Sequence, residues 1–250
     1  MSLKQNGLLV GMLVLAFIFS LTATSVSQTS TEPSNYDSAD GSADRPYKIS
    51  SPENLYWLSE NSGEWNNHYI QTEDIDASSI SNFDPIGNGS TEFTGTYDGK
   101  EYAIDGLTID RGNSNYVGLF GFTSGATIKN LGLNGVEISG ERYVGGLVGY
   151  SYNGTEIKDT YSTGSVSGRY NVGGLVGTNY GGQKEGNVAF SYSTATVTGD
   201  SGKVGGLVGY NRQSTDASGT TIIRNCYSTG NVIANNTVGG FVGENGGYID

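Results

Sequence analysis

Acidic side chains are concentrated between residues 73 and 110. Paired carboxylates on a β fold can hydrolyse glycosidic bonds, or hold the calcium ion that assists a polysaccharide lyase. Asp98 lies in an Asp-Gly turn sequence, however, and Asp76 in DIDA is typical of a turn or cap. We therefore predict no catalytic residue, and a structural calcium ion is the one cofactor that this segment suggests. The acidic residues singled out for this chemistry are Glu73, Asp74, Asp76, Asp84, Asp98, Glu101, Asp105 and Asp110.

Tyrosines recur at fixed places in the second half of the chain. Tyr161, Tyr192 and Tyr227 each begin a YST triplet, whereas Tyr150 and Tyr210 each follow the sequence VGGLVG. Facing outward, they would form a ladder of rings on which the apolar faces of sugars could lie. Facing inward, they would belong to the core, and the sequence leaves both orientations open. These five tyrosines are the candidate ligand-binding residues.

Other side chains that carry chemistry are scarce. His68 is the single histidine, which excludes a helical two-histidine zinc site within these 250 residues, and we predict no metal site. Cys226 is the single cysteine, so no internal disulfide can form. Sister repeats carry Thr160 and Ser191 in its place, which indicates a small packed residue instead of a reactive thiol.

Composition limits the partners. The formal net charge is -12, which argues against binding to nucleic acid or to an anionic membrane surface. The 40 glycines and the low share of charged residues, 15%, argue against a compact α-helical fold. N-glycosylation is allowed at three N-x-S/T sequons, Asn88, Asn153 and Asn235.

The elements that must position these residues are repeats. YVGGLVGYS at 143–151 returns as NVGGLVGTN from 171, KVGGLVGYN from 203 and TVGGFVGEN from 237, with a looser copy, YVGLFGFTS, from 116. The first valines of the five copies are 27, 28, 32 and 34 residues apart. A second element of the IKDTYSTG type follows each of the first four copies. The extra residues of the longer units are polar insertions between the two elements, which is typical of loops on a regular solenoid.

Each unit offers about three short strand segments rich in β-branched residues, and we predict an all-β, right-handed parallel β-helix. Aliphatic residues occupy both alternating positions of VGGLVG, so simple in-out alternation fails. A bulge at the paired glycines, or a second covered face, would allow aliphatic residues at both alternating positions to be buried. Just after the motif lie polar residues that could form a hydrogen-bonded ladder at one corner: Ser124, Ser151, Asn179, Asn211 and Asn245.

The chain divides into four parts. Residues 1–27, with an apolar run at 8–19, have the order of a secretory signal peptide. Residues 28–44 have few apolar side chains and are predicted to be a flexible linker. Residues 45–115 are predicted to form an N-terminal cap, with one helix near 51–61, and the first turns of the β-helix. Residues 116–250 carry the repeats, and the last copy stops early, so we expect a longer native chain or end-to-end self-association.

The repeat resembles the GLUG motif of bacterial and archaeal surface proteins and of some secreted peptidases. The resemblance covers residues 116–245, and FDPIGNGSTEFTGTYDGKEYAIDGLTI upstream is similar to the segment that commonly precedes such repeats. It implies an extracellular β-helical scaffold, usually one module of an adhesin-like protein, and no particular activity. Peptidases that carry the motif need a zinc domain with H-E-x-x-H, which this sequence lacks.

We therefore predict an exported, non-enzymatic module at the cell surface, for adhesion or envelope structure, that binds carbohydrate or protein through its side faces. Two alternatives stay open: a polysaccharide-degrading β-helix enzyme and a spacer module of a larger secreted hydrolase. The enzyme would need convergent acids on neighbouring turns. Asp159, Glu185 and Asp200 within the repeats share no repeat position.

Overall fold

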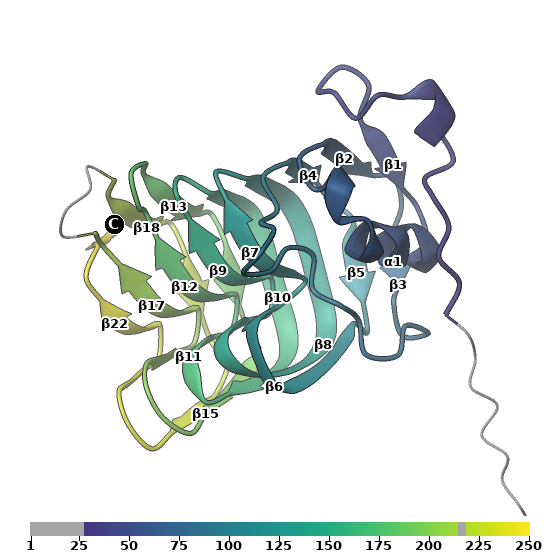
Figure 1. Cartoon of the computed structure of the whole chain (residues 1–250). Helices are drawn as coiled ribbons and strands as arrows, with labels where there is room; N and C mark the ends of the chain where they lie inside the picture. The colour runs from purple at the N-terminus through teal and green to yellow at the C-terminus, as the bar shows by residue number, and fades with distance from the viewer. Residues whose placement is uncertain (1–27, 215–218) are drawn as a thin grey trace, which may run out of the picture.

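The repeats form a β-solenoid of about 6 turns, as the sequence predicted (Figure 1). The computed structural model describes residues 28–214 and 219–250. The signal peptide predicted at 1–27 lies outside the described residues. Within them, no helix is long and apolar enough to cross a membrane.

Within the described residues, the larger sheet has 18 strands, and equivalent strands of successive turns pair in parallel. The strands are β1 (Tyr47–Ile49), β2 (His68–Gln71), β3 (Ile75–Asp76), β4 (Thr96–Asp98), β5 (Ala103–Asp105), β6 (Thr108–Val117), β8 (Thr127–Gly145), β10 (Glu156–Gly168), β11 (Tyr170–Gly173), β13 (Gly186–Ala189), β14 (Tyr192–Ser193), β15 (Thr196–Gly199), β16 (Val204–Gly205), β18 (Thr221–Arg224), β19 (Tyr227–Ser228), β20 (Val232–Ala234), β21 (Val238–Gly239) and β23 (Tyr248–Ile249).

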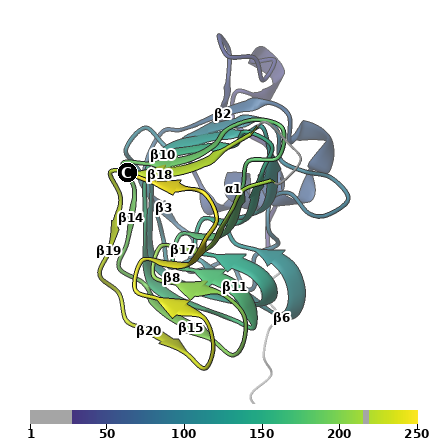
Figure 2. The same cartoon turned by 90° about the vertical axis from the view of Figure 1, so that its left-hand side faces the viewer.

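A second sheet covers one side of the solenoid. Its five parallel strands lie in the order β22-β17-β12-β9-β7 and face the viewer in Figure 1. Figure 2, seen from the C-terminal end, shows the larger sheet on other sides, with β10 and β18 on one, β14 and β19 on the next and β15 and β20 on a third. The bounds are β7 (Phe120–Ser124), β9 (Val148–Tyr152), β12 (Val176–Tyr180), β17 (Val208–Arg212) and β22 (Val242–Asn245).

The hexamer VGGLVG turns a corner between two strands, so the explanation differs from the predicted bulge within a strand or second covered face. In the first close copy, Val144 ends β8 in the larger sheet and Val148 begins β9 in the second sheet. Leu147 lies between them, and all three side chains are fully buried. Because the chain changes direction at Gly145 and Gly146, both alternating positions can point into one core. A second covered face is not needed.

The N-terminal end is closed by the predicted helix, α1 (Pro52–Glu60). The Ser51 hydroxyl accepts a hydrogen bond from the Asn54 backbone N–H, and Pro52 occupies the first turn, where its missing N–H costs nothing. Leu55 and Leu58 are fully buried against the first strands. Two short 3-10 helices flank this region, η1 (Tyr36–Ser38) and η2 (Ser62–Glu64).

Residues 28–44 lie against this cap and differ from the predicted flexible linker. The Tyr36 ring stacks on Tyr47 with centroids 4.9 Å apart. Asn35 donates to the Pro46 carbonyl and accepts from the Lys48 backbone N–H, so the segment is bound to β1. One aromatic ring and one amide thus supply the anchoring that the polar composition did not suggest.

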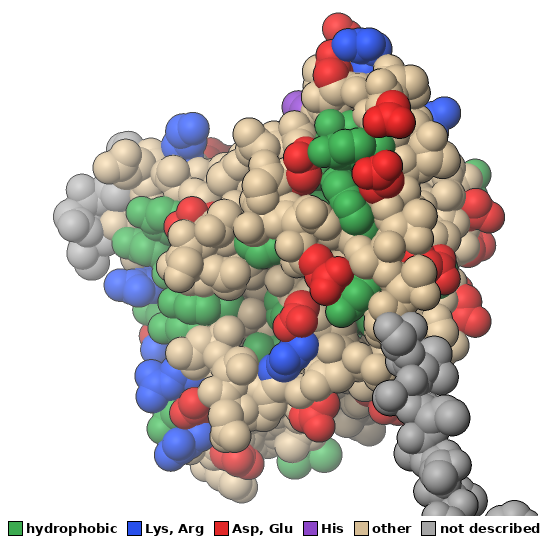
Figure 3. All heavy atoms as spheres, turned by 45° about the vertical axis from the view of Figure 1, so that its right-hand side comes forward, with side chains coloured by type: hydrophobic (Ala, Val, Ile, Leu, Met, Phe, Trp, Pro, Cys, Tyr) green, Lys and Arg blue, Asp and Glu red, His purple; other side chains and the backbone are tan. Residues whose placement is uncertain are grey.

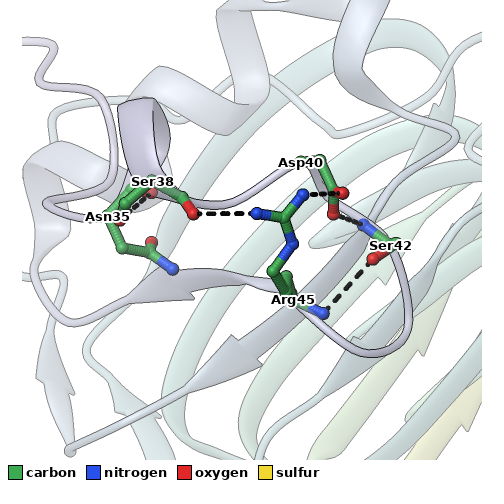
Figure 4. A network of polar contacts seen from close by, with 5 residues as sticks. All are labelled: Asn35, Ser38, Asp40, Ser42 and Arg45. Carbon is green, nitrogen blue, oxygen red and sulfur yellow. Dashed lines mark hydrogen bonds and ion pairs between the residues drawn. The ribbon is translucent and has the colours of Figure 1, made fainter.

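The loop after η1 is closed by hydrogen bonds and an ion pair (Figure 4). Arg45 pairs with the Asp40 carboxylate, and its backbone N–H donates to the Ser42 hydroxyl. The pKa of Asp40 is lowered to about 2, because Ser42 and Arg45 both donate hydrogen bonds to its carboxylate.

The contribution of Tyr36 to the stability of the cap changes with pH in the alkaline range. Its hydroxyl donates to the Glu64 carboxylate at 3.0 Å, and this bond and burial raise the pKa of Tyr36 from 10.0 to about 12. The unfolded chain therefore loses this proton first, so the stabilising contribution is complete below pH 10 and lost between pH 10 and 12. We expect the difference in free energy of unfolding between wild type and Tyr36→Phe to shrink over this interval in urea titrations. A constant difference would contradict this assignment.

The last turn is more exposed than the turns before it. Val238 is 49% exposed and Ile233 59%, whereas Val204, one turn earlier at the position of Val238, is fully buried. Tyr248 and Ile249 of β23 are also exposed. Stacking a further turn is what buries these positions elsewhere in the solenoid.

Candidate functional site

Three of the predicted tyrosines form one external ladder. Tyr161, Tyr192 and Tyr227 stand opposite each other on β10, β14 and β19, and their ring centroids are 5.0 and 4.8 Å apart with interplanar angles of 8° and 3°. Their side chains point outward, and Tyr227 is 52% exposed. At this spacing the rings cover each other's faces. The ladder therefore offers ring edges and hydroxyls along its length, and only its two end rings have a face that no other tyrosine covers.

One end of the ladder opens into a hollow. The residue that precedes Tyr161 in the stack is Gly132 of β8, which places no side chain over the ring. A Cβ atom at Gly132 would lie 2.4 Å from the Tyr161 Cζ and Oη atoms, so the ring leans over this glycine. The adjoining hollow, here called the Tyr161 hollow, has a volume of about 420 Å³ and is lined by Glu101, Asn130, Leu131, Gly132, Asp159 and Tyr161.

Polar groups of three successive turns meet at this hollow. Glu101, Asn130 and Asp159 have left-handed backbone angles, with φ of 70°, 51° and 52°, which mark the solenoid corner before the ladder. The carboxylates of Glu101 and Asp159 are on exposed residues. The Lys158 ammonium lies 3.4 Å from the Asp159 carboxylate, so charges of both signs are present.

Asp98 fixes the amide of Asn130. Its carboxylate accepts from Asn130 Nδ2 at 2.9 Å and lies 3.0 Å from Lys100 Nζ and 3.6 Å from Lys129 Nζ. Burial acts to raise the pKa of Asp98, but the hydrogen bonds from Asn130 and Lys100 outweigh it, and the pKa is lowered. Because its NH₂ group is held by Asp98, Asn130 is oriented to use its carbonyl oxygen as an acceptor for a ligand.

This arrangement suits a polyhydroxylated ring. The part of the Tyr161 ring that borders the hollow can contact the apolar side of a sugar, and the carboxylates and the side-chain carbonyl of Asn130 are acceptors for its hydroxyl groups. Sequence reasoning found Tyr161 but missed Gly132 and Asn130. The recurrence of Tyr161, Tyr192 and Tyr227 in YST, with LGL at the equivalent place one unit earlier, was the signal for the glycine.

The other two candidate tyrosines lie on a different face. Tyr150 and Tyr210 point outward from β9 and β17 of the second sheet, with Thr178 of β12 between them in register. Tyr150 packs edge-on against Tyr143 at 5.0 Å, and burial raises the pKa of its hydroxyl. The five predicted residues thus form two groups and not one ladder.

The polar residues predicted at one corner form a ladder inside the solenoid. Ser151 Oγ donates to Asn179 Oδ1 at 3.3 Å, Asn179 Nδ2 to Asn211 Oδ1 at 3.0 Å, and Asn211 Nδ2 to Asn245 Oδ1 at 2.7 Å. Ser151, Asn179 and Asn211 are buried. In the loose copy, Thr123 and not Ser124 stands opposite Ser151, because this copy has one residue fewer at the corner.

Six of the eight acidic residues singled out between 73 and 110 bind partners in the local structure, Asp98 as described above. Asp105 accepts from Asn134 at 2.8 Å and Asp110 from Ser139 at 2.6 Å, each across one turn. The remaining partners are the Ala103 backbone N–H for Asp74, the Ser78 backbone N–H for Asp76 and the Arg111 guanidinium for Asp84. Among residues 28–214 and 219–250, no three acidic, histidine or cysteine side chains gather to hold a metal ion.

The remaining candidates occupy ordinary positions. Cys226 is half-buried, and burial raises the pKa of its thiol, which disfavours the reactive thiolate. His68 lies half-buried in β2. Of the sequon asparagines, Asn88 and Asn235 are exposed, whereas the side-chain oxygen of Asn153 is shielded from solvent.

The protein is a parallel β-solenoid whose outer faces carry aromatic side chains. Within it, the GLUG motif matches residues 140–167, 168–198 and 200–233. The chain therefore carries three matched GLUG repeats within residues 140–233. The fourth close copy, at 237–245, falls outside the matched ranges but continues the second sheet as β22.

Similar proteins share only part of their length with this chain. A halomucin of Haloquadratum walsbyi is 39% identical over 133 residues, which are 50% of this chain and 1% of that protein. A provisionally named Gly-rich membrane protein of Evansella cellulosilytica is 33% identical over 55% of this chain and 17% of its own length. An immunoglobulin A1 protease of Streptococcus pneumoniae is 32% identical over 63% of this chain and 8% of its own length.

A solved structure has the same fold. The crystal structure of a Bacteroides ovatus protein, provisionally named an immunoglobulin A1 protease, superposes with a TM-score of 0.59 over 82% of this chain and 73% of that chain. The two sequences are 19% identical, so the likeness concerns the fold alone.

Proposed function

We propose that this protein is a non-catalytic surface or secreted module that binds polysaccharide, with the Tyr161 hollow as a subsite for one neutral sugar unit. The observation that carries the proposal is the Tyr161 ring at the wall of a hollow that three oxygen-bearing side chains also line. The mixture of Glu101 and Asp159 with neighbouring lysines favours a neutral ligand over a charged one.

The relatives support the cellular setting. They are named a halomucin, a Gly-rich membrane protein and immunoglobulin A1 proteases, names that suit proteins of the cell surface or its surroundings. The matched part is a small share of each protease, 7% and 8%, which favours a module outside the catalytic part. The local roles of the acids between 73 and 110 favour the same reading.

Replacing Tyr161 tests the subsite. We expect Tyr161→Ala to weaken binding of neutral oligosaccharides about tenfold, which corresponds to about 1.4 kcal/mol, because the stacking platform is lost. Tyr227→Ala is the matched control, since it removes an exposed ring from the far end of the same ladder. Calorimetry on a panel of neutral oligosaccharides measures the affinity, and thermal melting checks that both variants fold.

Three outcomes would redirect the assignment. Equal losses in both variants would remove the Tyr161 hollow as the site. New reducing or unsaturated ends after incubation would favour a polysaccharide-degrading enzyme. Neither binding nor new ends would favour a structural spacer, the role that the protease relatives suggest as an alternative.

A further inference from the structure

The outer side of the second sheet carries a separate cluster of aromatic rings, here called the aromatic face. Tyr150 is at its centre, with Phe122 at 5.0 Å, Tyr143 at 5.0 Å and Tyr180 at 6.5 Å between ring centroids. These three rings meet the Tyr150 ring at angles of 57°, 82° and 75°, and all four are half-buried, so several faces and edges reach solvent. The members are Tyr116, Phe122, Tyr143, Tyr150, Tyr152, Tyr180 and Tyr210.

Cationic groups lie over rings of this face. The Arg212 guanidinium carbon is 4.5 Å from the centre of the Tyr180 ring, and the Lys203 ammonium is 4.1 Å from that of Tyr210. At the adjoining corner, Arg142 and Arg169 lie 4.6 and 5.0 Å from the Tyr170 ring. These four residues are about a third of the 13 lysines and arginines of a chain whose net charge is -12.

The charges are therefore unevenly placed. Figure 3 shows hydrophobic side chains bordered by Lys and Arg on the left of the solenoid, whereas acidic side chains are prominent over the cap on the right. Glu244 partly neutralises Lys203 at 3.7 Å, and Glu141 lies 3.7 Å from Arg169. Arg212 is exposed and extends the line of Tyr152 and Tyr180 across successive strands.

The geometry selects the kind of partner. The inner strands β9, β12 and β17 of the sheet are paired on both sides, so their backbone groups are already used and a peptide cannot add as a strand across this face. Two rows of side chains instead run from turn to turn, Phe122, Tyr150, Thr178 and Tyr210 in one and Tyr152, Tyr180 and Arg212 in the other. Strands lie about 4.8 Å apart, so the rows form a straight track for a linear chain.

We propose that the aromatic face binds an acidic polysaccharide, with tyrosines contacting the apolar faces of its sugars and Arg212 and Lys203 pairing with its carboxylate or sulfate groups. Guanidinium groups bind such planar or tetrahedral anions with paired hydrogen bonds. This site is independent of the Tyr161 hollow, which lies on the larger sheet and is proposed to hold a neutral sugar.

The test compares polygalacturonate with a neutral dextran and with polyglutamate. We expect Arg212→Gln to weaken polygalacturonate binding about fivefold and Tyr180→Ala to weaken it further, with affinity falling as salt rises. Lys48→Gln is the matched control, because it removes one exposed positive charge from the cap and should leave binding unchanged. Tyr161→Ala should also leave it unchanged, so failure here and failure of the neutral sugar site are distinguished.

Three results would contradict the proposed binding of an acidic polysaccharide. Equal losses in Arg212→Gln and Lys48→Gln would mean that polygalacturonate responds only to total charge and would overturn the proposal. Polyglutamate bound as tightly as polygalacturonate, with the same losses on substitution, would replace the acidic polysaccharide by an acidic polypeptide. Absence of polygalacturonate binding to folded wild-type protein at low salt would also overturn it.

Discussion

Replacing Gly173 by alanine is expected to lower the free energy of unfolding by about 3 kcal/mol, or to prevent folding, because the new methyl group has no space. A Cβ atom there would lie 2.0 Å from the Val176 carbonyl oxygen and 2.6 Å from the Gly209 backbone nitrogen. Both are backbone atoms of the corner and of the next turn, so relief requires the strands to move apart. The same crowding holds at Gly145 and Gly205, which explains why the paired glycines recur.

Gly112→Ala is the control for Gly173→Ala. Gly112 lies in the same solenoid, but a Cβ atom there would meet no atom within 4 Å. The change in chain entropy is similar in the two variants, so the difference between them isolates the steric effect. Urea denaturation followed by far-ultraviolet circular dichroism measures both. Equal midpoints for the two variants would contradict the corner geometry.

The second large effect on stability is expected in the buried ladder formed by Ser151, Asn179 and Asn211. Asn179→Ala removes the acceptor of Ser151 and the donor of Asn211, both of which are buried. A buried polar group left without a partner costs about 1 to 3 kcal/mol, and the cavity adds to this. We expect the free energy of unfolding to fall by about 3 kcal/mol, measured by the same urea titration.

Asn245→Ala, at the end of the same ladder, is the control for Asn179→Ala. Asn245 is the last member and is exposed, so water can replace the hydrogen bond that Asn211 donates to it. Asn245→Ala should therefore cost less than about 1 kcal/mol. If Asn179→Ala costs no more than Asn245→Ala, the interior ladder contributes little to stability.

The two aromatic groups show how one architecture gives different surfaces. Where equivalent residues are all tyrosine, as at Tyr161, Tyr192 and Tyr227, the spacing between turns forces the rings into a closed stack. Where they vary, as in Phe122, Tyr150, Thr178 and Tyr210, the rings tilt and leave faces open. Regular repetition therefore stabilises a face, and its interruption creates room for a ligand.

The sequence by itself determined the repeat length, the all-β solenoid, the helix that begins after Ser51 and the polar ladder after the motif. These features follow from local rules. A helix cap or a turn glycine is determined by its neighbours along the chain, and the burial of a repeated side chain by the equivalent residue one repeat away. The recurrence of VGGLVG also required an interior position for its aliphatic residues.

Only the tertiary structure decided where the repeated hexamer bends, and therefore which way each tyrosine points. A bend between Val144 and Val148 shifts the alternation of side chains, and no local signal gives its position. It also decided that Tyr161 meets Gly132, and that Asp98 holds Asn130 beside both. These residues lie about 30 positions apart in the sequence and are brought together when the turns stack. The site therefore depends on the register of the strands, and contacts between turns determine that register.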